Sequence, residues 1–216
     1  MVLFGVSNMV SDVYECAREL GKKITKIVLN VPEQKRERTK DLETRLRELN
    51  ERPQIVPLEA FFPVEGEEYF VVPITPQKSD LIAMLIHTHH LEFSTLVHPT
   101  AYISPYATIG QGVFVGAKSV IGPGAVLRDH VSVGRGVTVG HDTVLHEYVR
   151  LSPGSNIAGH VEIYDGAMIG LGAGVIEELV VGRGAVVAAG AVVIRDVQEK
   201  TLVAGVPAVF KKTYED

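Results

Sequence analysis

The chain has 216 residues, 46% hydrophobic and 22% charged, and this composition excludes a disordered, collagen-like or disulfide-rich protein. Its net charge of −5 lacks the positive excess of a general nucleic-acid binder, so we expect no nucleic-acid partner. No uncharged apolar stretch approaches the roughly 18 residues of a membrane span, and Cys16 is the only cysteine, which suits a reducing compartment. We therefore expect a cytoplasmic protein, without a membrane span, that binds a small molecule.

The first part of the chain alternates strand-like apolar runs with amphipathic helical patterns, which is typical of a parallel α/β sheet. We predict helices at Met9–Leu20, around Leu42, Leu46 and Leu49, and at Asp80–Leu91. The predicted strands are Val2–Gly5, Ile24–Asn30, Gln54–Leu58, Tyr69–Ile74 and Phe93–Val97. Together these elements indicate a small Rossmann-like domain.

The glycines mark a change of architecture near residue 95. Only three of the 21 glycines precede residue 98, whereas the other 18 lie between Gly110 and Gly205. We therefore predict two domains, residues 1–93 and residues 94–216.

The second part is a six-residue repeat. From His98 onward, sixteen consecutive hexads such as GPGAVL and GHDTVL place Ile, Leu or Val at every sixth position, from Ile103 to Val193. A fixed short period of this kind predicts a parallel β-helix, in which each hexad forms one short strand and a turn. The fourth and sixth residues of a hexad should point into the core and the fifth should point outward.

Several outward positions are apolar. If three hexads close one coil of eighteen residues, one outer column contains Thr108, Val126, Val144, Glu162 and Val180. A largely apolar stripe needs a cover, so we expect a homo-oligomer.

The unbroken repeat, the junction Thr95–Ser104, the segment GHDTVL…LSPGSNIAGHVEI and the terminal segment Val203–Ala208 together resemble the left-handed β-helix acyltransferases. Within them, the sequence is similar to the sialic-acid O-acetyltransferase and bacillosamine N-acetyltransferase group. The resemblance implies a left-handed parallel β-helix after a substrate-binding α/β domain, a homotrimer, and acetyl-CoA bound between neighbouring β-helices. It implies transfer of the acetyl group to an amino or hydroxyl group of a sugar that is often nucleotide-linked, and it implies no metal.

The catalytic pair of that group, a histidine followed by an acidic residue, is matched by His141 and Asp142. Because imidazole titrates near neutral pH, His141 is suited to act as general base, with Asp142 holding the other ring nitrogen. Coils of eighteen residues put Gly159 beside His141, where the missing side chain should leave an open space. They also put His160 beside Asp142, which makes His160 a second candidate for the base.

The resemblance also implies residues that contact the two substrates. For acetyl-CoA, the matching positions are Arg150, Gly159, Leu171, Ala189, Lys211 and Lys212, with Arg150 in place of a histidine. For the sugar, they are Gly5, Ser7, Asn8 and Asn30. The loop that follows the first predicted strand begins at Gly5 and keeps only this one of the glycines that the group has there. Whether the loop binds a nucleotide therefore stays an open question.

Two other functions remain as alternatives. His141 and His146 have the H-x4-H spacing of γ-carbonic-anhydrase-like zinc hydratases, although Pro105 occupies the position of the third zinc ligand. The other alternative is a β-helix that binds sugars or has a structural role without catalysis. Bound zinc would indicate the hydratase, whereas binding of acetyl-CoA would indicate the acyltransferase.

Overall fold

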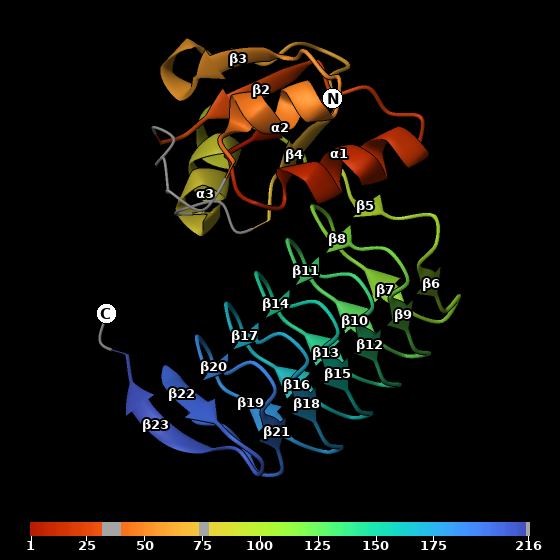
Figure 1. Ribbon diagram of the computed structural model, residues 1–216, viewed down its shortest axis with the longest axis vertical. Helices are drawn as coiled ribbons and strands as arrows, with labels where there is room; N and C mark the ends of the chain where they lie inside the picture. Colours follow the sequence, from red (N-terminus) through yellow and green to blue (C-terminus); the bar gives the residue numbers. More distant parts are fainter. Residues whose placement is uncertain (32–39, 74–77, 215–216) are drawn as a thin grey trace. The chain divides into compact units, whose positions relative to one another are not determined.

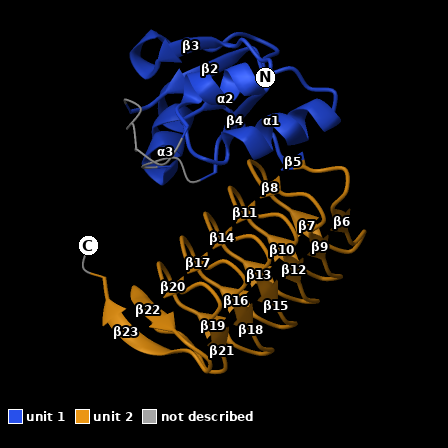
Figure 2. Cartoon of the chain, in the orientation of Figure 1, with its two compact units in different colours: residues 1–96 blue, residues 97–216 orange. Residues whose placement is uncertain are grey.

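The computed structural model of the protein describes residues 1–31, 40–73 and 78–214. The chain divides into two compact units, residues 1–96 and residues 97–216 (Figure 2). Phe93 and Ser94 pair with the first unit, because Phe93 forms a bridge to Tyr69 and the Ser94 amide donates to the Tyr69 carbonyl at 2.8 Å. Among the described residues, no helix reaches the length and hydrophobicity that crossing a bilayer demands.

The first unit is a four-stranded parallel sheet accompanied by helices, as the alternating pattern predicts (Figure 1). The strands are β1 (Val2–Phe4), β2 (Lys26–Leu29), β3 (Gln54–Pro57) and β4 (Tyr69–Val71). The helices are α1 (Val10–Glu19), α2 (Leu42–Glu48), the short 3-10 helix η1 (Leu58–Ala60) and α3 (Lys78–His89). The predicted helices and the first four predicted strands match these within a few residues, and Ile74, the predicted end of the strand Tyr69–Ile74, lies outside the described residues. The prediction of one strand at Phe93–Val97 is wrong, because Phe93 forms only a bridge to Tyr69 whereas Leu96 and Val97 pair within the β-helix.

The strand order of this sheet, β3-β2-β1-β4, creates a switch point between β1 and β4. The chain leaves β1 toward β2 and β3 on one side and returns to β4 on the other. Because the strands are parallel, their carboxyl ends share one edge, and the switch point at such an edge is where open α/β sheets bind ligands. The segment Gly5–Asn8 follows β1 at this edge, and Asn30 follows β2.

The second unit is a β-helix with eighteen residues in each coil. Each hexad contributes one strand of two residues, and each strand pairs in parallel with strands eighteen residues away, as Val126 does with Thr108 and Val144. The strands stack into three sheets, so that every coil has three faces (Figure 1). The predicted hexad register is confirmed.

The three sheets are named here by their number of strands. The five-stranded sheet contains β7 (Thr108–Ile109), β10 (Val126–Leu127), β13 (Val144–Leu145), β16 (Glu162–Ile163) and β19 (Val180–Val181). The six-stranded sheet contains β6 (Tyr102–Ile103), β9 (Val120–Ile121), β12 (Thr138–Val139), β15 (Asn156–Ile157), β18 (Gly174–Val175) and β21 (Val192–Val193). The eight-stranded sheet contains β5 (Leu96–Val97), β8 (Phe114–Val115), β11 (Ser132–Val133), β14 (Arg150–Leu151), β17 (Met168–Ile169), β20 (Val186–Val187), β22 (Thr201–Ala204) and β23 (Val209–Thr213).

The inward side chains of the hexads form one continuous apolar core, which includes Ile121, Leu127 and Leu145. The solvent exposure of the outward side chains varies more than the repeat suggests. Tyr102 is 58% exposed, for example, whereas Phe114 is 2% exposed. The hexad pattern determines in which direction a side chain points, and it carries no information about what packs over it.

Candidate active site

His141 and Asp142 form the turn between β12 and β13, at the corner between the six-stranded and five-stranded sheets. The backbone of this turn is tied to the coils on both sides. The Asp142 amide donates to the Pro123 carbonyl at 3.0 Å, and the His141 carbonyl accepts from the His160 amide at 2.9 Å. The corner therefore holds its side chains on a rigid scaffold.

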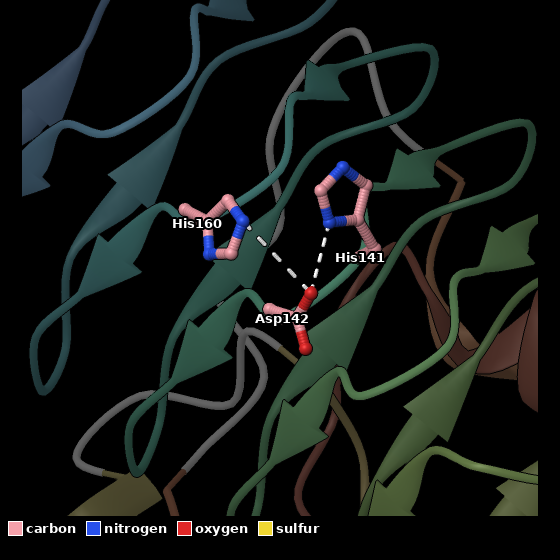
Figure 3. A group of neighbouring side chains, drawn as sticks. All are labelled: His141, Asp142 and His160. Atoms are coloured by element: carbon pink, nitrogen blue, oxygen red, sulfur yellow. Dashed lines mark hydrogen bonds and ion pairs between the residues drawn. The ribbon is translucent and has the colours of Figure 1, made fainter.

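The two side chains form a hydrogen-bonded pair, as the sequence predicts (Figure 3). His141 Nδ1 lies 2.9 Å from Asp142 Oδ2, and both side chains are about half exposed. A carboxylate only accepts, so Nδ1 carries the proton and Nε2 of the neutral ring keeps its lone pair. This arrangement gives His141 the tautomer of a general base.

The backbone at Asp142 and His160 adopts a conformation that glycine prefers. The third residue of every hexad from Gly112 to Gly190 has a positive φ, with 55° at Asp142 and 56° at His160. A side chain in this left-handed region costs about 1 kcal/mol or slightly more. Because Lys118, Tyr148 and Glu178 share this conformation at the same hexad position, the strain at Asp142 and His160 comes from the repeat and does not by itself mark a functional site.

Glycines on the neighbouring coils make room for the pair. A Cβ atom added to Gly159 would lie 2.6 Å from His141 Nε2, and one added to Gly124 would overlap Asp142 Oδ1. The imidazole thus lies directly against the Gly159 backbone, where we expected an open space. The expectation was wrong because the ring itself takes the room that the missing side chain leaves.

His160 is the third member of this cluster. Its Nε2 lies 4.0 Å from the same Asp142 oxygen, and its ring meets the His141 ring edge-on with 4.9 Å between the centroids (Figure 3). The structure therefore brings together His141, Asp142, Gly159 and His160. Because His141 has the shorter contact with the carboxylate, its geometry fits a general base better than that of His160.

The remaining residues expected to contact acetyl-CoA lie elsewhere on the coil. Arg150 is the outward residue of β14 in the eight-stranded sheet, where it donates to Met168 Sδ and burial lowers the pKa of its guanidinium. Leu171 and Ala189 stack on one another at the corner between the eight-stranded and six-stranded sheets, where the Gly190 amide donates to the Leu171 carbonyl at 2.8 Å. Within one chain, these residues and the His141 corner occupy different edges of the coil.

Lys211 and Lys212 belong to a strand that follows the terminal segment Val203–Ala208. They lie on β23, which pairs antiparallel with β22, and both side chains are exposed. Lys212 Nζ lies 4.7 Å from the centroid of the Tyr214 ring. The two ammonium groups are accessible to an anionic ligand.

The residues expected to contact the sugar gather at the switch point of the first unit. The Ser7 hydroxyl donates to the Pro73 carbonyl at 2.6 Å, and Asn8 Oδ1 accepts from Arg45 Nη2 at 2.8 Å. Gly5 turns the chain after β1 with a φ of 78°, and Asn30 is partly buried after β2. Sequence reasoning missed Arg45, because it lies on α2, far from Asn8 in the sequence.

A second group of side chains that could hold a metal ion contains His146, Glu147 and Asp165. In the described part of the chain, His141 belongs to one such group and His146 to the other. His146 Nε2 instead lies 2.8 Å from Glu162 Oε1. Within one chain, the described residues thus place the two histidines of the H-x4-H spacing in different groups.

Comparisons with known proteins agree with this architecture. The family description "hexapeptide repeat of succinyl-transferase" matches residues 106–141, and no curated protein matches the chain. The acetyltransferase domain of PglB from Neisseria gonorrhoeae is 31% identical, with 97% of this chain and 98% of that domain aligned and a TM-score of 0.81. A perosamine N-acetyltransferase from Caulobacter crescentus is 27% identical over 98% of this chain and 96% of that chain, with a TM-score of 0.82.

WeeI from Acinetobacter baumannii shares the fold, with 19% identity and a TM-score of 0.81 over 97% of this chain and 98% of that chain. The matches confirm an α/β unit followed by a left-handed parallel β-helix. The PglB domain is more than 30% identical to this chain over nearly its whole length, and identity at this level indicates a common family as well as a common fold. The chain therefore belongs to the left-handed β-helix, hexapeptide-repeat acetyltransferases, and it is an acyltransferase.

Proposed function

We propose that the enzyme transfers the acetyl group of acetyl-CoA to an amino group of a nucleotide-linked sugar, with His141 as general base. The observation that carries this proposal is the hydrogen bond between His141 Nδ1 and Asp142 Oδ2 on an accessible corner of the β-helix. Solved relatives support the choice of substrates. The perosamine N-acetyltransferase was crystallised with CoA and GDP-perosamine, and the PglB domain with acetyl-CoA.

The reaction follows from the tautomer of His141. The neutral amine of the sugar attacks the thioester carbonyl carbon and forms a C–N bond, while Nε2 takes a proton from the nitrogen. The tetrahedral intermediate then collapses, the C–S bond breaks, and the thiolate of CoA receives the proton from the imidazolium. Asp142 stabilises that imidazolium through Nδ1, so the protons balance without a covalent enzyme intermediate.

The sugar nucleotide would bind at the switch point of the first unit. Its phosphates would meet the backbone of the turn Gly5–Asn8, and the Arg45 guanidinium that contacts Asn8 supplies a positive charge there. Because the Ser7 hydroxyl donates to Pro73, we expect main-chain amides to make most of these contacts.

Acetyl-CoA would bind between two chains of a homotrimer. Gly159 and His141 share one corner of the coil, whereas Leu171 and Ala189 share another. Contacts from both corners to one acetyl-CoA require a second chain, and the outer column with Val126, Val144 and Val180 offers apolar surface for its assembly. Lys211 would then reach the phosphates of CoA.

The direct test is calorimetric titration of acetyl-CoA into metal-free protein, followed by a screen of amino-sugar and hydroxy-sugar nucleotides for release of CoA. We expect binding without zinc and turnover with an amino sugar. Failure to bind acetyl-CoA would contradict the proposal, and about one tightly bound zinc per chain at His146 would favour the hydratase instead.

A further inference from the structure

The His141–Asp142 pair belongs to a larger cluster, of which the acyl-transfer mechanism uses only a part. Ligand atoms of His141, Asp142 and His160 lie within 4.8 Å of one another (Figure 3). Two imidazole nitrogens and one carboxylate oxygen form a donor set that Zn²⁺ takes in proteins. We propose that these three side chains, the zinc triad, bind one Zn²⁺ ion per chain, and that the bound ion inhibits the acetyltransferase.

The distances in the zinc triad are close to those of a tetrahedral zinc site. Bonds of about 2.0–2.2 Å put neighbouring ligand atoms of such a site about 3.3–3.6 Å apart. Asp142 Oδ2 lies 2.9 Å from His141 Nδ1 and 4.0 Å from His160 Nε2. The ligand spacing of a tetrahedral zinc site lies between these two distances. Small rotations of these half-exposed side chains would therefore supply three of the four zinc ligands, and water would supply the fourth.

The ligands come from two consecutive coils that the backbone holds in register. The His160 amide donates to the His141 carbonyl at 2.9 Å, and the Glu178 amide on the following coil donates to the Gly159 carbonyl at 3.2 Å. Metal sites on rigid elements lose little conformational freedom when the ion binds. The scaffold therefore favours coordination by all three side chains over binding to a single histidine.

The charges around the zinc triad favour a cation. In the part of the chain that the structure describes, Asp142 forms ion pairs only with His141 and His160. Glu177 and Glu178 are exposed on the next coil and add negative charge. Among the residues that the structure describes, no lysine or arginine forms an ion pair with the carboxylate that would hold the metal.

The second group, His146, Glu147 and Asp165, differs in this respect. Arg183 Nη2 lies 2.8 Å from Asp165 Oδ2, and His146 Nε2 lies 2.8 Å from Glu162 Oε1. A metal ion there would lie beside a guanidinium and would have to break two contacts. This group serves as an internal control for the zinc triad.

Bound zinc would remove the general base. Coordination through Nδ1 of His141 leaves the ring proton on Nε2, which then has no lone pair for the amine. The inhibitory effect rests on the function proposed above, whereas binding of zinc does not.

The test compares His160→Gly with His146→Ala. His160→Gly removes one ligand at a position whose φ of 56° suits glycine, so the fold and the His141–Asp142 pair remain. In calorimetric titrations of metal-free protein with Zn²⁺, we expect one ion per chain in the wild type, affinity at least about tenfold weaker in His160→Gly, and wild-type affinity in His146→Ala. Equal affinity in wild type and His160→Gly would overturn the proposal, as would loss of binding in His146→Ala alone or no binding to the wild type.

A second measurement separates the inhibition from the proposed function. Zinc should slow release of CoA by the wild type, while His160→Gly at the same zinc concentration should keep most of its own metal-free rate. If zinc binds without slowing the wild type, the inhibitory role is wrong. If the metal-free wild type transfers no acetyl group, the proposed function fails, and the calorimetric result for zinc still decides the site.

Discussion

At the scale of single residues, the reactivity of His141 depends on glycines of the neighbouring coils, whose missing side chains leave room for the His141–Asp142 pair. Gly159 has no Cβ, so the imidazole rests against its backbone, and Gly124 leaves the same kind of room for Asp142. The sequence shows the histidine and the carboxylate directly. It shows the two glycines only after the coil length is known, because their relation to the pair depends on stacking at eighteen-residue intervals.

Replacement of Gly159 by alanine should displace the ring without unfolding the protein. The new methyl group would lie 2.6 Å from Nε2, and the half-exposed ring is free to move away from it. Because a shift of about 1 Å in a reacting group costs up to about 100-fold in rate, we expect turnover to fall by about 10-fold to 100-fold. Gly174→Ala is the matched control, since a Cβ there meets only the Asn156 carbonyl at 4.0 Å and should leave the rate unchanged. Equal rates for the two variants would contradict this account of Gly159.

Replacement of Asp142 by glycine should separate stability from activity. The φ of 55° suits glycine, so the free energy of unfolding should stay the same or rise by up to about 1 kcal/mol. Turnover should fall by about 100-fold or more, because nothing then fixes the tautomer of His141. Denaturant titration and the rate of CoA release check the two parts. A clear loss of stability would show that the carboxylate has mainly a structural role.

At the scale of elements, the strands of the β-helix can be predicted from the sequence because the repeat has a fixed period, whereas the α/β unit has no such repeat. In the β-helix, a fixed period of six sets every strand, and strands β6 to β21 follow the predicted hexads without a shift. In the α/β unit, the predicted helix Met9–Leu20 becomes Val10–Glu19, so that Met9 and Leu20 are the capping residues and the pattern predicts each end to within one residue. Contacts between distant segments could not be predicted in this way. The hydrogen bond between Arg45 and Asn8 is an example, since the local sequence of neither residue indicates the other.

Two substitutions within one strand test the orientation that the repeat imposes. In β9, Ile121 points inward and is fully buried, whereas Val120 points outward and is 42% exposed. Ile121→Ala should lower the free energy of unfolding by about 2–5 kcal/mol. Val120→Ala should lower it by less than about 1 kcal/mol. Denaturant titrations of the two variants give the answer, and similar losses would mean that the strand does not have the orientation described here.

At the scale of the whole molecule, the proposed active site needs more than one chain. The corner with His141 and the corner with Leu171 and Ala189 are different edges of the β-helix. The sequence supplies the apolar column that suggests assembly, but the repeat alone does not determine which faces of two chains meet.

A charge in the apolar column tests the assembly. Val144 pairs in register with Glu162 and Val126, so Val144→Asp would bring two carboxylates together in the predicted contact. We expect the wild type to sediment as a trimer and Val144→Asp to shift toward monomers, with loss of acetyl-CoA affinity. Asn156→Asp, on the exposed face of the six-stranded sheet, should stay trimeric. A monomeric wild type with full activity would contradict the two-chain site.

The central claim is that His141 takes the proton of the attacking amine, and the rate of acetyl transfer by His141→Ala tests it most directly. The measurement compares release of CoA by the wild type and by the variant, with chelator present and with saturating acetyl-CoA and amino-sugar nucleotide. The account predicts turnover lower by about 10²–10⁴, with unchanged stability and retained binding of acetyl-CoA. A variant that turns over at the wild-type rate would contradict it.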